Sequence, residues 1–201
     1  IIVLCVKPSQ IKMVTNELVQ VPNINKKLII SIVAGVGMDD INQWLGNECR
    51  IIRAMPNTPA MLRNGATGLL ANPLCESIHR DIAESIMRAV GVTVWLSSED
   101  QLDTVTAVSG SGPAYFFLMM EALEKAAIAE GLSAQAAHLL TTQTALGAAH
   151  MAMQSQDNIS TLKEQVTSKG GTTEYALKIL TDADIERYFI KAVLAAKQRA
   201  S

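Results

Sequence analysis

The fold class of this chain is decided by the stretch LIISIVAGVG, residues 28–37. A run of apolar, mostly β-branched residues is typical of a strand buried on both faces of a parallel sheet, and the glycines mark the turn that ends it. Similar runs stand at Ile1–Val6 and Arg50–Met55. Amphipathic segments separate the three runs, so we expect strands and helices to alternate in an open, doubly wound, mostly parallel sheet.

The remaining segments fall into two groups. Before residue 98 we predict a helix at 10–19 capped by Ser9, a short helix opening at Asp39 or Asp40, a helix at 76–89, and strands at 68–71 and 92–96. After residue 98 the sequence predicts only helices, with a C-cap at Gly131 and N-caps at Ser133 and at Asp157 or Asn158. We therefore place a sheet domain at residues 1–97 and an all-α domain at 98–201, with helices at 103–108, 113–130, 134–153, 159–166, 173–180 and 185–199.

Composition excludes several classes of protein. The 201 residues are 49% hydrophobic and carry a net charge of −2, without a basic stripe, so we expect no nucleic-acid partner. No apolar stretch reaches the roughly 20 residues that span a bilayer, so we expect no membrane partner. Cys5, Cys49 and Cys75 are scattered and lack CxxC spacing, which favours free thiols in a reducing cytoplasm over disulfides or a metal site.

The second half is unusually apolar. Residues 116–120 read FFLMM, so the helix that contains them is hydrophobic nearly all round. Such a helix is buried in a large core or in an obligate interface, and about 100 residues offer limited room to hide it. We therefore predict a homodimer with interlocked helices, which could assemble into a higher oligomer.

The stretch VTSKGGTT, residues 166–173, stands directly before a predicted helix. Its glycines allow close approach of the backbone, and the helix start offers unpaired N–H groups and the positive end of the dipole. Together with the hydroxyls of Ser168, Thr172 and Thr173, this predicts a cradle for a carboxylate or phosphate. The alternative is an ordinary helix start capped by threonine.

Two further segments carry unusual residues. The stretch SGSGPAY, residues 109–115, predicts a kink that brings N–H groups and hydroxyls toward a neighbour, or else a helix crossing that needs small side chains. The stretch RAMPNTPA, residues 53–60, follows a strand, as do Val6-Lys7-Pro8 and Ala34-Gly35-Val36. The carboxyl ends of parallel strands are where ligands of doubly wound folds bind, so we expect a site along this edge.

The chain resembles pyrroline-5-carboxylate reductases in five stretches, taken in their order and spacing: VKP, AGV, RAMPNTPA, SGSGPAY and VTSKGGTT. The resemblance runs over essentially the whole chain. It implies a Rossmann-like domain followed by a helical dimerisation domain. It also implies hydride transfer from NADPH or NADH to the C=N carbon of 1-pyrroline-5-carboxylate, which gives proline as the last step of proline biosynthesis.

The resemblance also implies residue roles. The cofactor groove would be lined by Val6, Lys7, Pro8, Ala34 and Gly35, and the nicotinamide bordered by Met55, Asn57, Thr58 and Pro59. The substrate carboxylate would be held by Ser168, Gly170, Gly171, Thr172 and Thr173. The Thr173 hydroxyl matches the family's hydroxyl that meets the ring nitrogen, which makes it the expected catalytic group. Glu99 aligns with a family position near the substrate, although an exposed helix-start carboxylate is the equal alternative. His79, His138 and His150 lie outside these motifs, and no metal is expected.

The sequence departs from the family pattern at two places. The family opens with a glycine-rich strand–turn–helix that seats the pyrophosphate, and residue 1 enters about 60 residues later. We therefore expect a truncated sheet, no readable choice between NADH and NADPH, and weak dinucleotide binding by this chain. Position 169 is lysine where the family usually has proline, so the loop could be more flexible and its charge could attract a carboxylate.

Two competing interpretations remain. β-Hydroxyacid dehydrogenases share this architecture, but they use a lysine base on the long helix, whereas residues 113–123 contain no Lys or His. The chain could also be an inactive dimerisation fragment. An assay of NAD(P)H oxidation with 1-pyrroline-5-carboxylate, on this chain and on a version with added N-terminal strands, separates these alternatives.

Overall fold

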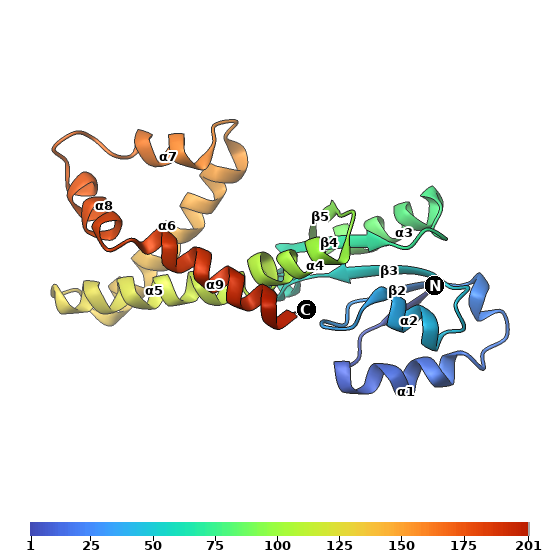
Figure 1. The fold of residues 1–201 in the computed structure, drawn as a ribbon. Coiled ribbons are helices and arrows are strands. Elements are labelled where there is room, and N and C mark those ends of the chain that lie inside the picture. The colour runs from blue at the N-terminus through green and yellow to red at the C-terminus, as the bar shows by residue number, and fades with distance from the viewer. Residues whose placement is uncertain (201) are drawn as a thin grey trace. The chain divides into compact units, whose positions relative to one another are not determined.

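The computed structural model describes residues 1–200, which form a five-stranded sheet with flanking helices and a set of further helices (Figure 1). Strand order follows chain order. All neighbouring pairs are parallel except β3 and β4, which are antiparallel, so the predicted mostly parallel sheet is confirmed. The strands are β1 (Ile2–Leu4), β2 (Leu28–Ser31), β3 (Arg50–Met55), β4 (Gly65–Ala71) and β5 (Gly91–Trp95).

Side-chain alternation along β2 and β3 builds a core on each face of the sheet. Ile29 and Ile51 belong to a core with α1 (Pro8–Leu18) and α2 (Met38–Trp44). Ile30 and Ile52 belong to the opposite core, with Ala83 and Met87 of α3 (Ser77–Arg88). In Figure 1, α1 and α2 lie toward β1 and β2, and α3 lies toward β4 and β5. All four isoleucines are fully buried, as the sequence predicts for strands covered on both sides.

Glycines let neighbouring segments approach closely in β4 and β5. A Cβ at Gly91 would collide with the backbone of Gly65, its partner across the ladder. A Cβ at Gly68 would lie 3.0 Å from Val105, because α4 (Glu99–Val105) packs directly on β4. The short 3₁₀ turn η2 (Thr58–Leu62) connects β3 to β4.

After α4 the helix continues as a π-helical segment, η3 (Thr106–Gly110). The predicted helix at 103–108 therefore begins four residues earlier and changes its winding. The other predicted helices are present, with ends within three residues. They are α5 (Gly112–Ala129), α6 (Ala134–Gln154), α7 (Ile159–Gln165), α8 (Thr172–Asp182) and α9 (Ile185–Ala200).

The predicted helix caps are partly right. Ser133 and Asn158 accept hydrogen bonds from Ala136 N and Thr161 N, as N-caps do. Gly131, at φ +98°, ends α5 with the paired backbone bonds of a Schellman motif. Ser9 is not a cap, because α1 begins one residue before it, at Pro8, and proline fits the first helical position.

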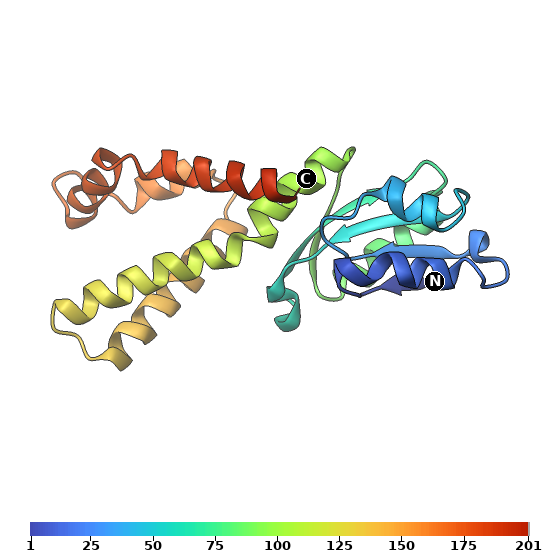
Figure 2. The ribbon, with the colours of Figure 1, turned by 60° about the horizontal axis from the view of Figure 1, so that its bottom comes forward.

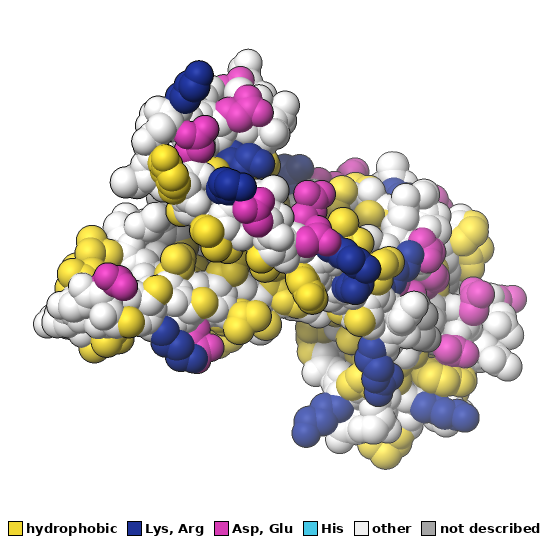
Figure 3. All heavy atoms as spheres, turned by 60° about the vertical axis from the view of Figure 1, so that its left-hand side comes forward, with side chains coloured by type: hydrophobic (Ala, Val, Ile, Leu, Met, Phe, Trp, Pro, Cys, Tyr) yellow, Lys and Arg dark blue, Asp and Glu magenta, His cyan; other side chains and the backbone are white. Residues whose placement is uncertain are grey.

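The described residues form two compact units, residues 1–113 with 193–200 and residues 114–192. The domain boundary at 97/98 stays a prediction; these units divide later because α4 packs on β4. In the second unit many large apolar side chains are exposed, among them Phe116, Phe117 and Leu118 of α5. Figure 2 shows the helices of this unit as a ribbon, and hydrophobic side chains, in yellow, gather on the face of the molecule seen in Figure 3. Within residues 1–200, no helix is long and apolar enough to cross a membrane.

Candidate active site

Three strand ends meet at one edge of the sheet, because β1, β2 and β3 are adjacent and parallel. The first predicted group follows β1: Lys7 is the N-cap of α1, Pro8 opens that helix, and Val6 packs against the core. Ala34 and Gly35 follow β2, and Met55 ends β3. The structure thus brings the predicted cofactor-binding residues of three separate segments to a single edge.

A polar hollow of about 250 Å³ lies at this edge. Gly35 lines it with φ +67°, a left-handed conformation that favours glycine, and a Cβ there would meet no atom within 4 Å. The backbone after β2 is therefore open to close approach by a ligand, which is what a dinucleotide groove at this edge requires. The other lining residues are Val36, Gly37, Asp40, Arg53, Glu99, Asp103 and Ala200.

Glu99 has a defined place in this hollow. Its Oε2 forms a short ion pair with Arg53 Nη1, and its Oε1 accepts a 2.9 Å hydrogen bond from the backbone N–H of Met38. Arg53 also donates to the carbonyl oxygen of Val33 over 3.4 Å. The carboxylate of Glu99 is therefore fixed between α2, α4 and β3, rather than standing as an isolated charge at a helix start.

The sequence patterns did not identify Arg53 as the partner of Glu99. The signal was present in the pattern IIRAM, because a single arginine inside a buried strand requires a polar or charged partner. Its side chain is only 6% exposed. The partner could not be read from the sequence, since Glu99 lies 46 positions away.

Asn57 has a structural position that the sequence did not reveal. Its amide nitrogen donates to the carbonyl oxygen of Ser109 over 3.0 Å, and its Oδ1 accepts from Ala66 N over 2.9 Å. The side chain therefore ties the loop after β3 to β4 and to η3. With both ends of its amide engaged, Asn57 can border a cofactor by shaping the loop that also carries Thr58 and Pro59.

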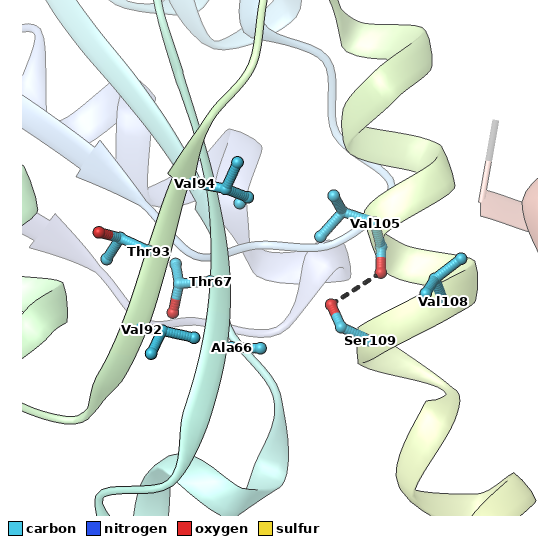
Figure 4. Close-up of a pocket in the computed structure, with 9 residues that line it drawn as sticks. Ala66, Thr67, Val92, Thr93, Val94, Val105, Val108 and Ser109 are labelled. Carbon is cyan, nitrogen blue, oxygen red and sulfur yellow. Dashed lines mark hydrogen bonds between the residues drawn. The ribbon is translucent and has the colours of Figure 1, made fainter. Parts of the chain in front are cut away.

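The segment SGSGPAY joins two helices, as the predicted kink requires: Ser109 and Gly110 end the π-helical segment η3, and α5 begins at Gly112. The Ser109 hydroxyl donates to the carbonyl oxygen of Val105 over 3.0 Å, so it bonds within its own helix. An apolar cavity of about 210 Å³ lies between the helical wall formed by Val105, Val108 and Ser109 and the strands β4 and β5. Val94 and Val105 face each other across it (Figure 4). A π-helical turn is frequent at functional sites, and here its Ser109 carbonyl receives the Asn57 bond.

The predicted carboxylate cradle lies in the other compact unit, at the start of α8. Gly171 is the N-cap, and Gly170 has φ +73°. A Cβ at Gly171 would collide with the Ser168 hydroxyl, so only glycine fits this turn without a shift. The structure thus places Ser168, Gly170, Gly171, Thr172 and Thr173 around one helix N-terminus, as predicted.

Two of the cradle's N–H groups are already used. Gly171 N donates to the carbonyl oxygen of Ser168 over 3.0 Å, which closes the turn. Gly170 N donates to the carboxylate of Glu174 over 2.6 Å, a contact that the sequence analysis did not anticipate. Within residues 1–200 the N–H groups of Thr172 and Thr173 carry no hydrogen bond, as the first turn of a helix allows.

The remaining reactive side chains lie elsewhere. His79 accepts from the Glu76 backbone N–H in a capping box, and His138 contacts Glu124. Burial raises the pKa of the Cys49 and Cys75 thiols, which disfavours the nucleophilic thiolate. Among residues 1–200 no group of three or more His, Cys, Asp or Glu could hold a metal ion.

Comparison with known proteins places these features in a family. The family model for the dimerisation domain of pyrroline-5-carboxylate reductase matches residues 99–201. A pyrroline-5-carboxylate reductase of Pseudomonas aeruginosa is 45% identical over 202 residues, which cover this whole chain and 73% of that protein.

Solved structures agree. A pyrroline-5-carboxylate reductase from Coxiella burnetii has 52% identity and a TM-score of 0.94, over 98% of this chain and 73% of that one. The Plasmodium falciparum enzyme, solved with NADP bound, has 31% identity and a TM-score of 0.89, over 98% of this chain and 79% of that one. With the strand-edge residues, the SGSGPAY turn and the α8 cradle all in place, this chain belongs to the pyrroline-5-carboxylate reductase family.

Proposed function

We propose that this chain is an oxidoreductase that reduces 1-pyrroline-5-carboxylate to L-proline with a hydride from NADPH or NADH. The observation that carries the proposal is family membership over the full chain, at 45% identity to a reductase of that name. The fold supports it, because the open edge beside Gly35 suits close approach of a dinucleotide. When bound, the nicotinamide supplies the hydride.

The cofactor would be held by residues of the three strand ends. Val6, Lys7 and Pro8 follow β1, and Ala34 and Gly35 follow β2. Met55, Asn57, Thr58 and Pro59 would border the nicotinamide at the end of β3. A neighbour with NADP bound supports the cofactor class.

The substrate would be bound by the cradle at the start of α8. The open N–H groups of Thr172 and Thr173, with the Ser168 hydroxyl, would hold its carboxylate at the positive end of the helix. Gly170 and Gly171 would shape the turn, since their own N–H groups are engaged. The Thr173 hydroxyl would meet the ring nitrogen and Glu99 would lie near the substrate. A protonated cyclic imine is already electrophilic, so orientation of the reactants is the protein's main contribution.

We further propose that the chain works as a homodimer in the cytoplasm. The family model is that of a dimerisation domain, and α5 exposes a row of large apolar side chains. Interlocked helices would cover such a surface, and higher assemblies are possible on the same basis. Three free cysteines agree with a reducing compartment.

The test is an assay of NADPH and NADH oxidation with 1-pyrroline-5-carboxylate, monitored by nicotinamide absorbance and by formation of proline. We expect turnover that depends on both reactants. The control uses a β-hydroxyacid in place of the imine, and the oxidised cofactor in place of the reduced one. Turnover of the hydroxyacid but not of the imine would overturn the proposal in favour of a β-hydroxyacid dehydrogenase. Absence of turnover with either substrate would also contradict the proposal.

A further inference from the structure

We propose that Arg53 is a positioning residue, which acts through Glu99 to fix the substrate side of the active site and the Gly35–Gly37 turn together. This inference rests on the proposed function for the meaning of Glu99. Two contacts define what we call the clamp: Arg53 pairs with Glu99, and Glu99 accepts a hydrogen bond from the Met38 N–H. These contacts rest on geometry alone.

The burial of Arg53 shows that the pair is more than a surface contact. Its neighbours Ile51, Ile52 and Ala54 in β3 are at most 2% exposed, and Arg53 itself is 5% exposed. An arginine in such surroundings is tolerated when its charge is paired, and Glu99 pairs it here, although Arg53 Nε has no hydrogen-bond partner within residues 1–200. Here the fork of the guanidinium spans two acceptors, Glu99 and the Val33 carbonyl, which the single ammonium of lysine would match less well.

The carboxylate of Glu99 replaces a missing helix cap. The N-cap of α2 is Gly37, which has no side chain to bind the free N–H groups of the first turn. Glu99 supplies the acceptor from outside the helix, at 2.9 Å from Met38 N. Through this bond, the placement of Arg53 reaches the turn that the proposed function assigns to the cofactor.

Glu99 remains accessible while it is held in this way. Its side chain is 40% exposed and lines the polar hollow, whereas the Arg53 side chain is covered. The accessible carboxylate is therefore the group that can meet a ligand, and the buried arginine can act only through it. This division predicts that removal of either residue damages the same function.

The first test is a double-mutant cycle on turnover, with Arg53→Met, Glu99→Ala and the double variant. Because a small misplacement of a site residue can cost on the order of 100-fold, we expect kcat/KM for the imine to fall about 10- to 100-fold in each single variant. The double variant should be no worse than Glu99→Ala. Losses that multiply would show independent roles and overturn the proposal.

The second test does not require activity. Amide hydrogen exchange at Met38 should become roughly 10-fold faster in Arg53→Met, because the acceptor for its N–H is no longer held. Arg50→Met is the matched control: Arg50 lies in the same strand but donates to the Asn25 carbonyl, so Met38 exchange should stay unchanged. Unchanged exchange in Arg53→Met would overturn the clamp.

Arg53→Lys keeps the proposal testable if Arg53→Met does not fold. Lysine retains the charge but lacks the paired donors of the guanidinium. The turnover and the Met38 exchange rate of this variant should therefore both lie between those of the parent and those of Glu99→Ala. Values equal to the parent would overturn the proposal. Failure of the parent protein to reduce the imine would instead count against the proposed function. The exchange measurement would still test whether Arg53 holds Glu99 in place as the acceptor for the Met38 N–H.

Discussion

At the scale of single residues, Thr173 provides the sharpest test of the proposed chemistry. Its hydroxyl stands in the first turn of α8, beside two N–H groups that have no partner within residues 1–200. Thr173→Val keeps the shape of the side chain and removes the hydroxyl. Since a hydrogen bond to a charged group contributes about 1.5–3 kcal/mol, kcat/KM for the imine should fall roughly 10- to 100-fold.

The control for this variant is Thr181→Val near the other end of the same helix. It makes the same chemical change at an exposed position outside the cradle. Its steady-state kinetics should equal those of the parent. If Thr173→Val also keeps the parental kcat/KM, the hydroxyl does not meet the substrate.

Gly171 carries a second prediction at this scale. A Cβ at this position would collide with the Ser168 hydroxyl and lie 3.0 Å from the Ser168 carbonyl oxygen. Gly171→Ala should therefore distort the turn and raise KM for the imine by about 10-fold or more, with a smaller effect on the melting temperature. In Gly147→Ala the added methyl meets no atom within 4 Å, so it serves as a control for adding a Cβ. A parental KM in Gly171→Ala would show that the turn does not shape the substrate site.

At the scale of elements, β5 is joined to α3 by a polar contact network around Glu84. Trp95 Nε1 donates to Glu84 over 2.8 Å, and Arg88 and Thr93 also contact this carboxylate. The bond from Trp95, followed by the charge of Arg88, lowers the pKa of Glu84 below its ordinary value. A carboxylate with a lowered pKa stabilises the folded state above its unfolded pKa of about 4.3, and this contribution is lost as the pH falls through the folded pKa.

We therefore expect Glu84→Gln to lower the melting temperature at neutral pH and to make less difference as the pH falls below about 4. Differential scanning calorimetry across this range, together with Trp fluorescence, measures the effect. Glu17→Gln, at an exposed position of α1, is the comparison. A Glu84→Gln difference that stays constant down to the acid limit would show that the Trp95 contact depends little on the carboxylate charge.

Sequence reasoning predicted the elements with strong local signals. The bounds of β3 agree at both ends, because a buried apolar run is flanked by charged residues and prolines. For β4 only residues 68–71 were predicted, since Gly65-Ala66-Thr67 has little intrinsic strand preference and gains it from pairing with β5. The antiparallel direction of β4 was missed for the same reason, because direction is set by tertiary pairing.

The site was predictable to a similar extent. The α8 cradle and the strand-end residues follow from glycine, proline and threonine patterns, which act locally. The partners Arg53 and Glu99, and the bond from Asn57 to Ser109, join segments about 50 positions apart. Such contacts depend on the fold as a whole, and a single sequence holds no direct signal for them.

At the scale of the whole molecule, the exposed apolar side chains of α5 predict self-association. Phe116, Phe117 and Leu118 are 59%, 65% and 66% exposed, which is unusual for large apolar residues of one helix. Phe117→Glu should weaken the dimer by on the order of 100-fold or more in Kd, since a buried unpaired carboxylate is costly. Sedimentation velocity over a range of concentrations measures this change.

The matched control is Ile78→Glu, which adds the same charge to an exposed apolar position of α3. It should leave the sedimentation profile of the parent intact. A stable monomer of the parent protein at micromolar concentration, or a dimer unaffected by Phe117→Glu, would contradict an interface on this helix.

The antiparallel pairing of β3 with β4 also bears on how the chain finds its fold. Met55 lies opposite Gly68, so this ladder closes through residues 56–67, whereas Leu4 reaches Ser31 only after the longer connection 5–30, which contains the helix α1. Short loops cost less entropy to close, and local contacts form sooner than distant ones. The β3–β4 hairpin should thus be the folding nucleus onto which the parallel strands assemble, and conservative core substitutions there should slow refolding more than those in β1.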